Sequence, residues 1–343
     1  MEIKEWLMEL SAAAGVSGLT GALDMAERLF APFCPMVRES GSLIGKLQGA
    51  SDYTILFDAH IDEIGMIVTG LEEGGFVRVS KAGGVDVRTL AAQPVTIWGR
   101  EPVEGLFAST PPHLQTAGEN KVPDIAQQLV DTGLSAERAA ALIRPGDRVT
   151  FRQEPAALLN DYVTGKSLDN RAGVAALLEA ARILSSEKVL PCSVTFLLSD
   201  QEELGCRGAQ TAAFAQRPDE AVAVDVSFGD SPSVPAHKTG KLGGGGMIGI
   251  SPVLSGPVTE KLTRLAEKSG RPWQPEVMGG ETSTNADVIA LSGAGTPCGL
   301  VSIPLRSMHT TAEVIRLCDV ENVGRLLADY ALAGGLKGDD GAC

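Results

Sequence analysis

The sequence has little of what would place the protein in a membrane, on a nucleic acid or in an oxidising compartment. It contains no run of about 18 apolar residues, so no membrane-spanning helix is expected. The first residues, "MEIKEWLMEL", mix charges with apolar residues and predict an amphipathic helix instead of a signal peptide. Asp and Glu (43) outnumber Lys and Arg (29), and the net charge of −14 argues against binding to nucleic acids or anionic membranes.

Cysteine and histidine are scarce as well. The six cysteines show no CxxC pair and no other paired spacing, which is typical of reduced thiols in a cytoplasmic protein. Of the four histidines, His113 and His237 lie in loops near prolines and are interpreted as structural. The glycine-containing stretches "GKLGGGG" and "TGKS" lack the spacing of a phosphate-binding loop, so they are predicted to form turns.

The composition is that of an ordinary globular protein, and the chain contains two kinds of segment: one alternates strands with helices, and the other consists mainly of short β-type runs. Residues 164–343 alternate continuous apolar strands such as "SVTFLLS" with amphipathic helices, and residues 1–68 contain a similar strand, "YTILFDAH", which ends at His60. Residues 69–163 contain short β-type runs separated by Gly, Pro and Asp, with one short helix, "SAERAAALI". The terminal "GGLKGDDGAC" is small and polar and is predicted to be frayed.

These patterns predict an α/β fold. Strands that alternate with helices imply a three-layer α/β/α domain with a mostly parallel or mixed sheet. We expect residues 1–68 and 164–343 to form this domain, and residues 69–163 to form a smaller β-rich, barrel-like insert.

Histidines and carboxylates recur where predicted strands end. In an open α/β sheet, ligands bind beyond the carboxyl ends of the strands, so side chains at those ends should gather at one edge. The residues concerned are His60, Asp62, Asp169, Glu202, Glu203, Asp225 and His309. Two imidazoles with several carboxylates and no thiolate are typical of a pair of divalent cations such as zinc, cobalt or manganese. Such cations would neutralise a carboxylate cluster that otherwise has to be protonated or stay in water.

Each of these residues also has a simpler interpretation when it is taken alone. His60 could end a strand without binding anything, and Asp169 could be a helix N-cap. Glu202 and Glu203 could be a solvated pair on a loop. Asp225 is harder to dismiss, because a carboxylate inside the apolar strand "AVAVDV" would be costly to bury without a partner. Taken together with His309, the set favours a metal site.

Five motifs also resemble a known family, the tetrahedral aminopeptidases. This dizinc group of co-catalytic metallopeptidases includes the glutamyl and deblocking aminopeptidases, and some of its members are labelled cellulases. The resemblance extends along nearly the whole chain, insert included. The motifs, in the family's order, are "DAHIDEIG", "SLDNRAG", "DQEELGCRGA", "AVDVSFGD" and "SIPLRSMHTTAEVI".

The resemblance implies a role for each candidate residue. His60 and Asp225 would bind one cation, and Glu203 and His309 would bind the other. Asp169 would bridge the two cations. Glu202 would be the general base that takes a proton from water and passes it to the leaving amine. Asp62 would orient His60, as metal-bound histidines usually require.

The resemblance further implies a cytoplasmic enzyme that trims short peptides from their N-termini with two divalent ions per subunit, zinc being expected first. It implies homo-oligomers, with the insert mediating contacts in a hollow tetrahedral dodecamer. The chain departs from the family at two positions: Asn285 stands where Asp is usual, and Ser307 where Tyr is usual. Neither position is a metal ligand in the family, so both bear on specificity and efficiency more than on activity.

Three other functions stay open. An amidohydrolase that removes an acyl group from an amino acid would use the same metal centre. An endoglucanase-type glycoside hydrolase would use two acids and leave the histidines without a role. A metal-stabilised assembly protein without catalytic activity would not need Glu202.

Overall fold

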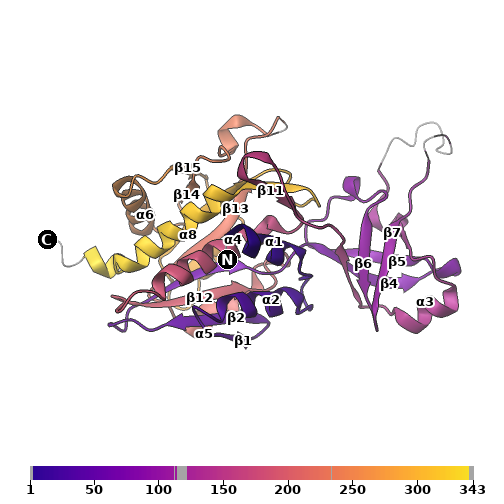
Figure 1. Ribbon diagram of the computed structural model, residues 1–343, viewed down its shortest axis with the longest axis horizontal. Helices are drawn as coiled ribbons and strands as arrows, with labels where there is room; N and C mark the ends of the chain where they lie inside the picture. Colours follow the sequence, from indigo (N-terminus) through magenta and orange to yellow (C-terminus); the bar gives the residue numbers. More distant parts are fainter. Residues whose placement is uncertain (1–2, 112, 114–121, 233, 340–343) are drawn as a thin grey trace.

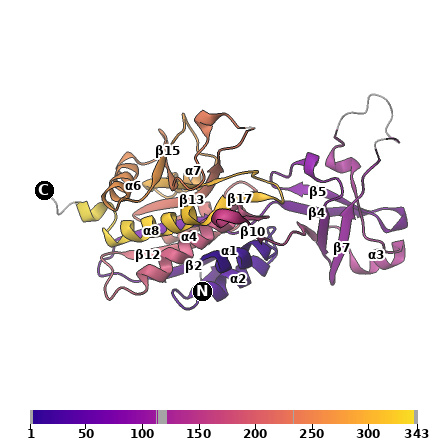
Figure 2. The same ribbon diagram turned by 45° about the horizontal axis from the view of Figure 1, so that its top comes forward.

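The computed structural model describes residues 3–111, 113, 122–232 and 234–339, which form a larger body and a smaller lobe (Figures 1 and 2). The body is built on an eight-stranded sheet in the order β1-β2-β12-β3-β13-β16-β14-β15. Its strands are β1 (Met36–Glu39), β2 (Ser42–Leu47), β3 (Thr54–His60), β12 (Ser193–Ser199), β13 (Glu220–Phe228), β14 (Gly246–Ile250), β15 (Trp273–Val277) and β16 (Cys298–Leu305).

The centre of this sheet is parallel, and strands β2, β14 and β15 run antiparallel to it. Strands β12, β3, β13 and β16 run in the same direction. Strand β2 pairs antiparallel with both β1 and β12, and β14 pairs antiparallel with β16 and parallel with β15. The predicted mostly parallel or mixed sheet is therefore confirmed, and the parallel centre brings four carboxyl ends to one edge.

Helices cover both faces of the sheet. One face packs against α1 (Ile3–Ala12), α2 (Gly21–Phe30), α4 (Leu168–Leu184), α6 (Gly256–Lys268) and α8 (Leu317–Leu332) (Figure 1). The other face packs against α5 (Arg207–Gln216) and α7 (Asn285–Ala290). In β13, Val222 and Val224 belong to the first core, whereas Ala221 and Ala223 belong to the second. Because side chains alternate across a strand, a strand buried on both faces is apolar throughout. The predicted three-layer α/β/α architecture is confirmed.

The smaller lobe is a closed six-stranded antiparallel barrel in the order β4-β5-β8-β7-β6-β9, with a core of its own. Its strands are β4 (Gly65–Leu71), β5 (Val77–Ala82), β6 (Pro94–Trp98), β7 (Pro102–Phe107), β8 (Leu129–Asp131) and β9 (Arg148–Phe151). The predicted helix of the insert is α3 (Ala136–Leu142), which is N-capped by Ser135. The predicted barrel-like insert is thus confirmed as part of the fold, while its limits at residues 69 and 163 stay a prediction.

A three-stranded antiparallel sheet completes the fold. It consists of β10 (Ala156–Ala157), β11 (Tyr162–Gly165) and β17 (Glu313–Arg316). In its register Gly165 pairs with Glu313, which places the start of α4 beside the segment that follows β16.

The C-terminal segment is more ordered than predicted over its first part. Residues Leu336–Asp339 form a short 3₁₀ turn, and the Leu336 amide donates to the carboxylate of Glu220 at 3.0 Å. The last four residues of the predicted frayed segment lie outside the described residues.

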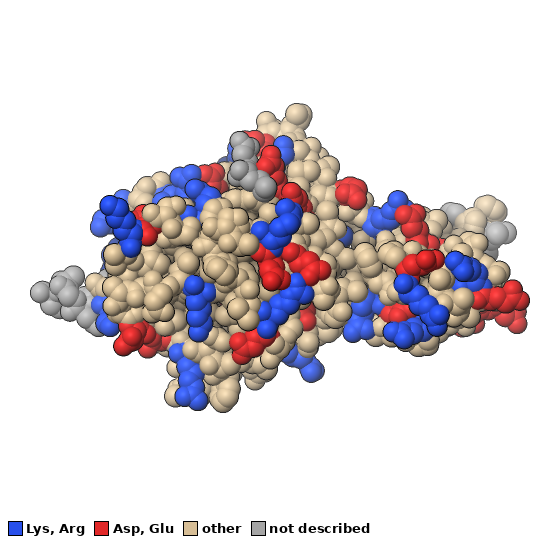
Figure 3. Space-filling view, turned by 60° about the horizontal axis from the view of Figure 1, so that its bottom comes forward, with Lys and Arg blue, Asp and Glu red and all other residues tan. Residues whose placement is uncertain are grey.

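The surface carries both signs of charge on the face seen in Figure 3. Basic and acidic side chains are interspersed on the body and on the smaller lobe. Several of them form ion pairs, for example Arg38 with Glu27 at 2.7 Å. None of the helices in the described ranges is long and apolar enough to cross a membrane. That nucleic acids and membrane surfaces are not partners stays a prediction.

The core generates the first testable prediction. Phe196 in β12 is buried against the rings of Phe30 and Phe57, with centroids 6.1 and 6.0 Å away, whereas Phe214 on α5 is 61% exposed. Phe196→Ala should lower the free energy of unfolding by about 3–5 kcal/mol, because it leaves a cavity among these rings. Phe214→Ala should change it by about 0.5 kcal/mol or less. Urea denaturation of both variants checks this, and equal losses would contradict it.

Candidate metal and active site

The residues that the sequence singled out lie together at the edge of the sheet where the parallel strands end. His60 is the last residue of β3, and Asp225 lies in the second half of β13. Glu202 and Glu203 lie in the loop between β12 and α5. Two further residues arrive from outside these strands. Asp169 lies at the irregular start of α4, where the Asp169–Asn170 peptide bond is cis, and His309 lies between β16 and β17 with a left-handed backbone (φ 60°).

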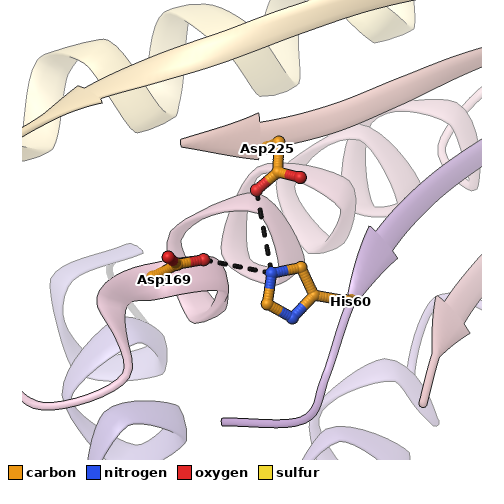
Figure 4. A group of neighbouring side chains, drawn as sticks. All are labelled: His60, Asp169 and Asp225. Carbon is orange, nitrogen blue, oxygen red and sulfur yellow. Dashed lines mark hydrogen bonds and ion pairs between the residues drawn. The ribbon is translucent and has the colours of Figure 1, made fainter. Parts of the chain in front are cut away.

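Two groups of side chains share Asp169. The His60 Nε2 atom lies 3.0 Å from Asp169 Oδ1 and 3.7 Å from Asp225 Oδ1 (Figure 4). The His309 Nε2 atom lies 3.3 Å from Asp169 Oδ2 and 3.5 Å from Glu203 Oε1. Within each group the three ligating atoms lie within 4.8 Å of one another. One carboxylate that presents an oxygen to each group is what a two-cation site requires.

Asp62 connects the first histidine to the two glutamates. The His60 Nδ1 atom lies 3.2 Å from the Asp62 carbonyl oxygen and 3.5 Å from its carboxylate. This contact leaves Nε2 directed at Asp169 and Asp225. The same carboxylate accepts hydrogen bonds from the backbone amides of Glu202 at 3.0 Å and Glu203 at 3.3 Å. Asp62 is buried, so these contacts fix the position of the loop relative to His60.

Glu313 is a site residue that the sequence analysis did not single out. Its side chain is buried and accepts hydrogen bonds from the backbone amides of Asp169 at 3.1 Å and His309 at 2.9 Å. One carboxylate therefore holds the shared aspartate and the second histidine in place. Its signal in the sequence is the acidic residue at the start of the short strand "EVIR", four residues after His309.

The barrel lobe also reaches the site. The His309 Nδ1 atom lies 3.2 Å from the carbonyl oxygen of Gly84, which follows β5. A Cβ atom at Gly84 would lie 2.4 Å from that nitrogen, and one at Gly83 would lie 3.1 Å from Glu203 Oε2. Gly83 also has a φ of 84°, a conformation that favours glycine. The paired glycines thus permit the close approach of the lobe to the second group.

The electrostatics of the cluster suit bound cations. Burial raises the pKa of Glu202 to about 7 and that of Glu203 to about 8. The hydrogen bond to Asp169 raises the pKa of His309 to about 9. Burial opposes protonation of His60, but its contacts with Asp169 and the other carboxylates raise its pKa well above the usual value. Divalent cations would neutralise these carboxylates, so the donor set fits a metal pair.

The remaining candidates lie outside the two groups. Asn285 is buried and donates from Nδ2 to Asp58 Oδ2 and to Ser199 Oγ, both at 2.8 Å, so it links the ends of β3 and β12. Ser307 is exposed, and its carbonyl oxygen accepts a hydrogen bond from Thr310 Oγ1 at 2.7 Å. His113 and His237 are exposed and belong to neither metal-binding group.

A family model described as M42 glutamyl aminopeptidase matches residues 41–326 of the chain. A lysyl aminopeptidase from Pyrococcus furiosus is 28% identical over 331 residues, which cover 94% of each chain.

Solved structures of such enzymes are similar over almost their full length. A TET aminopeptidase from a marine-sediment Thaumarchaeota archaeon has a TM-score of 0.93 at 28% identity and covers 99% of both chains. The TET1 peptidase of Pyrococcus horikoshii, described as able to assemble into a tetrahedron or a large octahedral shell, has a TM-score of 0.86 at 30% identity, covering 96% of this chain and 99% of its own. A Thermotoga maritima protein described as an endoglucanase has a TM-score of 0.78 at 26% identity, covering 96% and 97%.

The pKa values of the cluster predict that the stability of the metal-free protein falls with pH, whereas the stabilisation gained from added cations rises with pH. Glu202, Glu203 and His309 have pKa values near 7, 8 and 9 in the fold, against 4.5, 4.5 and 6.5 without it. Because the folded cluster binds more protons than the unfolded chain between about pH 4.5 and 9, stability in chelator should fall as the pH rises through this range. Added zinc or cobalt should stabilise more at high pH, because cations bind deprotonated ligands.

Melting temperatures at pH 5.5, 7 and 8.5, with chelator and with cation, check this expectation. A metal-free melting temperature that rises with pH, or a cation effect that is the same at all three values, would contradict it.

Proposed function

This chain is an aminopeptidase of the M42 family, and we propose that it binds two divalent cations and removes N-terminal residues from short peptides with a free α-amine. The observation that supports this most directly is Asp169, which lies between the two histidine groups with one oxygen toward each. Glu202, a member of neither group, lies beside the first one, with Oε2 4.0 Å from His60 Nε2.

The two groups would divide the cations between them. His60 and Asp225 would hold one cation, Glu203 and His309 the other, and Asp169 both. The nitrogen and oxygen donors suit zinc, cobalt or manganese, with zinc our first expectation. Bound there, the cations would lower the pKa of water and polarise the carbonyl group of the scissile bond.

Glu202 is the proposed general base. It is partly buried and lies beside the first ligand group without belonging to it, which places its carboxylate next to water held there. Its carboxylate takes a proton from the attacking water as oxygen adds to the carbonyl carbon, and gives that proton to the leaving nitrogen as the peptide bond breaks. The thiol of Cys206 lies 3.5 Å from Glu202 Oε1 and is placed to donate a hydrogen bond that orients this side chain.

We also propose that the protein forms closed homo-oligomers in the cytoplasm. The similarity to a peptidase that assembles into a tetrahedron supports a tetrahedral dodecamer, with contacts through the barrel lobe. The five described cysteines are free thiols, which supports a reducing compartment.

Glu202→Gln provides a specific prediction. The amide keeps the size of the side chain but cannot accept the proton, so turnover should fall by about three orders of magnitude or more, within the range typical of general bases. Metal analysis should still find two cations per chain, because Glu202 belongs to neither ligand group. A variant with near-normal turnover would remove Glu202 from this role, and one cation per chain would contradict the two-metal site.

The function itself is tested by the release of free amino acids from a mixed set of short peptides. Metal-stripped protein is titrated with zinc or cobalt, and N-acetylated copies of the same peptides are assayed in parallel. We expect trimming of the free peptides only, and only with metal. Cleavage of the acetylated peptides alone would identify an amidohydrolase, and hydrolysis of β-glucans instead of peptides would favour the glycosidase.

A further inference from the structure

A row of polar side chains continues from the metal ligands toward the edge of the sheet. Ser302 in β16 lies directly beside Asp225 in β13 in the parallel register, on the same face. Neighbouring strands are about 4.8 Å apart, so Ser302 is the side chain next to this ligand. Ser302 Oγ in turn donates a hydrogen bond of 2.6 Å to Glu276 Oε2 of β15. A carboxylate that the ligand set does not use therefore lies one serine beyond Asp225.

Glu276 reaches Ser302 across the intervening strand β14. In the register of β14 and β15, Glu276 lies opposite Gly249. Ser227, two residues after Asp225 on β13, is a second hydrogen-bond partner of the Glu276 carboxylate. The serines on two strands thus direct Glu276 toward the ligand cluster and away from the open edge of the sheet.

Serines, and no basic side chain of the described residues, hold the carboxylate of Glu276. No Lys, Arg or His among the residues that the structure describes forms an ion pair with it. Burial raises its pKa, and the negative charge of Asp225 raises it further. Glu276 is half-buried, and a carboxylate withdrawn from water without a cation is destabilising, which two serine hydrogen bonds offset only in part. A ligand that brings its own positive charge would remove the cost.

We propose that Glu276 determines the substrate class of the aminopeptidase by binding a cationic side chain, that of Lys or Arg, at the N-terminus of the peptide. The inference rests on the proposed function of the metal site. If the first residue of a peptide is held at the cations, its side chain lies among the residues next to the metal ligands, and Ser302 and Glu276 are such residues. The four-carbon stem of Lys spans one intervening side chain such as Ser302, and its ammonium group then meets the carboxylate of Glu276.

The test compares kcat/KM of the metal-loaded enzyme on tripeptides that differ only in their first residue. Lys is compared with Met, which is similarly long and unbranched but uncharged, and with Glu. We expect wild type to favour Lys over Met at least tenfold. Glu276→Gln should reduce this ratio at least tenfold while kcat/KM on the Met peptide changes less than threefold. Glu276→Lys should make Glu the preferred first residue.

Glu267→Gln is the matched control, because it makes the same chemical change at an exposed position on α6 and should leave the ratio unchanged. A wild type that cleaves Met peptides as well as Lys peptides overturns the inference, as does a folded Glu276→Gln variant that keeps the wild-type ratio. If Glu276→Gln does not fold, Glu276→Asp replaces it and should retain a preference for Lys. A wild type that cleaves no free peptide would instead count against the proposed function.

Discussion

The site depends on one carboxylate that two histidines approach from opposite parts of the chain. Asp169 presents Oδ1 to His60 and Oδ2 to His309, at 3.0 and 3.3 Å. Every other feature of the site serves this arrangement. The parallel centre of the sheet delivers His60 and Asp225, while Glu313 fixes the backbone of both Asp169 and His309. Cations bound there, as proposed, would offset the cost of gathering so many carboxylates in a buried place.

The sequence was sufficient to predict the residues that converge, because their positions follow from a simple rule of α/β sheets. Side chains at the carboxyl ends of parallel strands meet at one edge, so His60, Asp225 and the glutamates after β12 could be expected there. The alternation of strands with helices, and the change to short β runs in the middle of the chain, likewise predicted the layers and the barrel. Both predictions succeeded because the spacing of strands, helices and strand ends along the chain determines which layer or edge of the fold they occupy.

Other features could not be predicted because they depend on register and on contacts between distant segments. Glu313 reads as an ordinary strand residue until the pairing of β11 with β17 places it beside Asp169. The relation of Glu276 to Asp225 depends on the order of four strands and on the hydrogen bond from Ser302. Asn285 was recognised as an unusual residue, but its role in linking Asp58 to Ser199 is visible only once β3 and β12 lie side by side.

The contact between Gly84 and His309 has a consequence for how the two parts of the molecule are related. The lobe is a closed barrel with its own hydrophobic core, which is typical of a domain that can be exchanged between proteins. Its first turn after β5, however, supplies the oxygen that faces the ring of a candidate metal ligand in the body. A graft that replaced the lobe without keeping Gly83 and Gly84 would therefore lose the contact with His309 and crowd Glu203, two candidate metal ligands of the body.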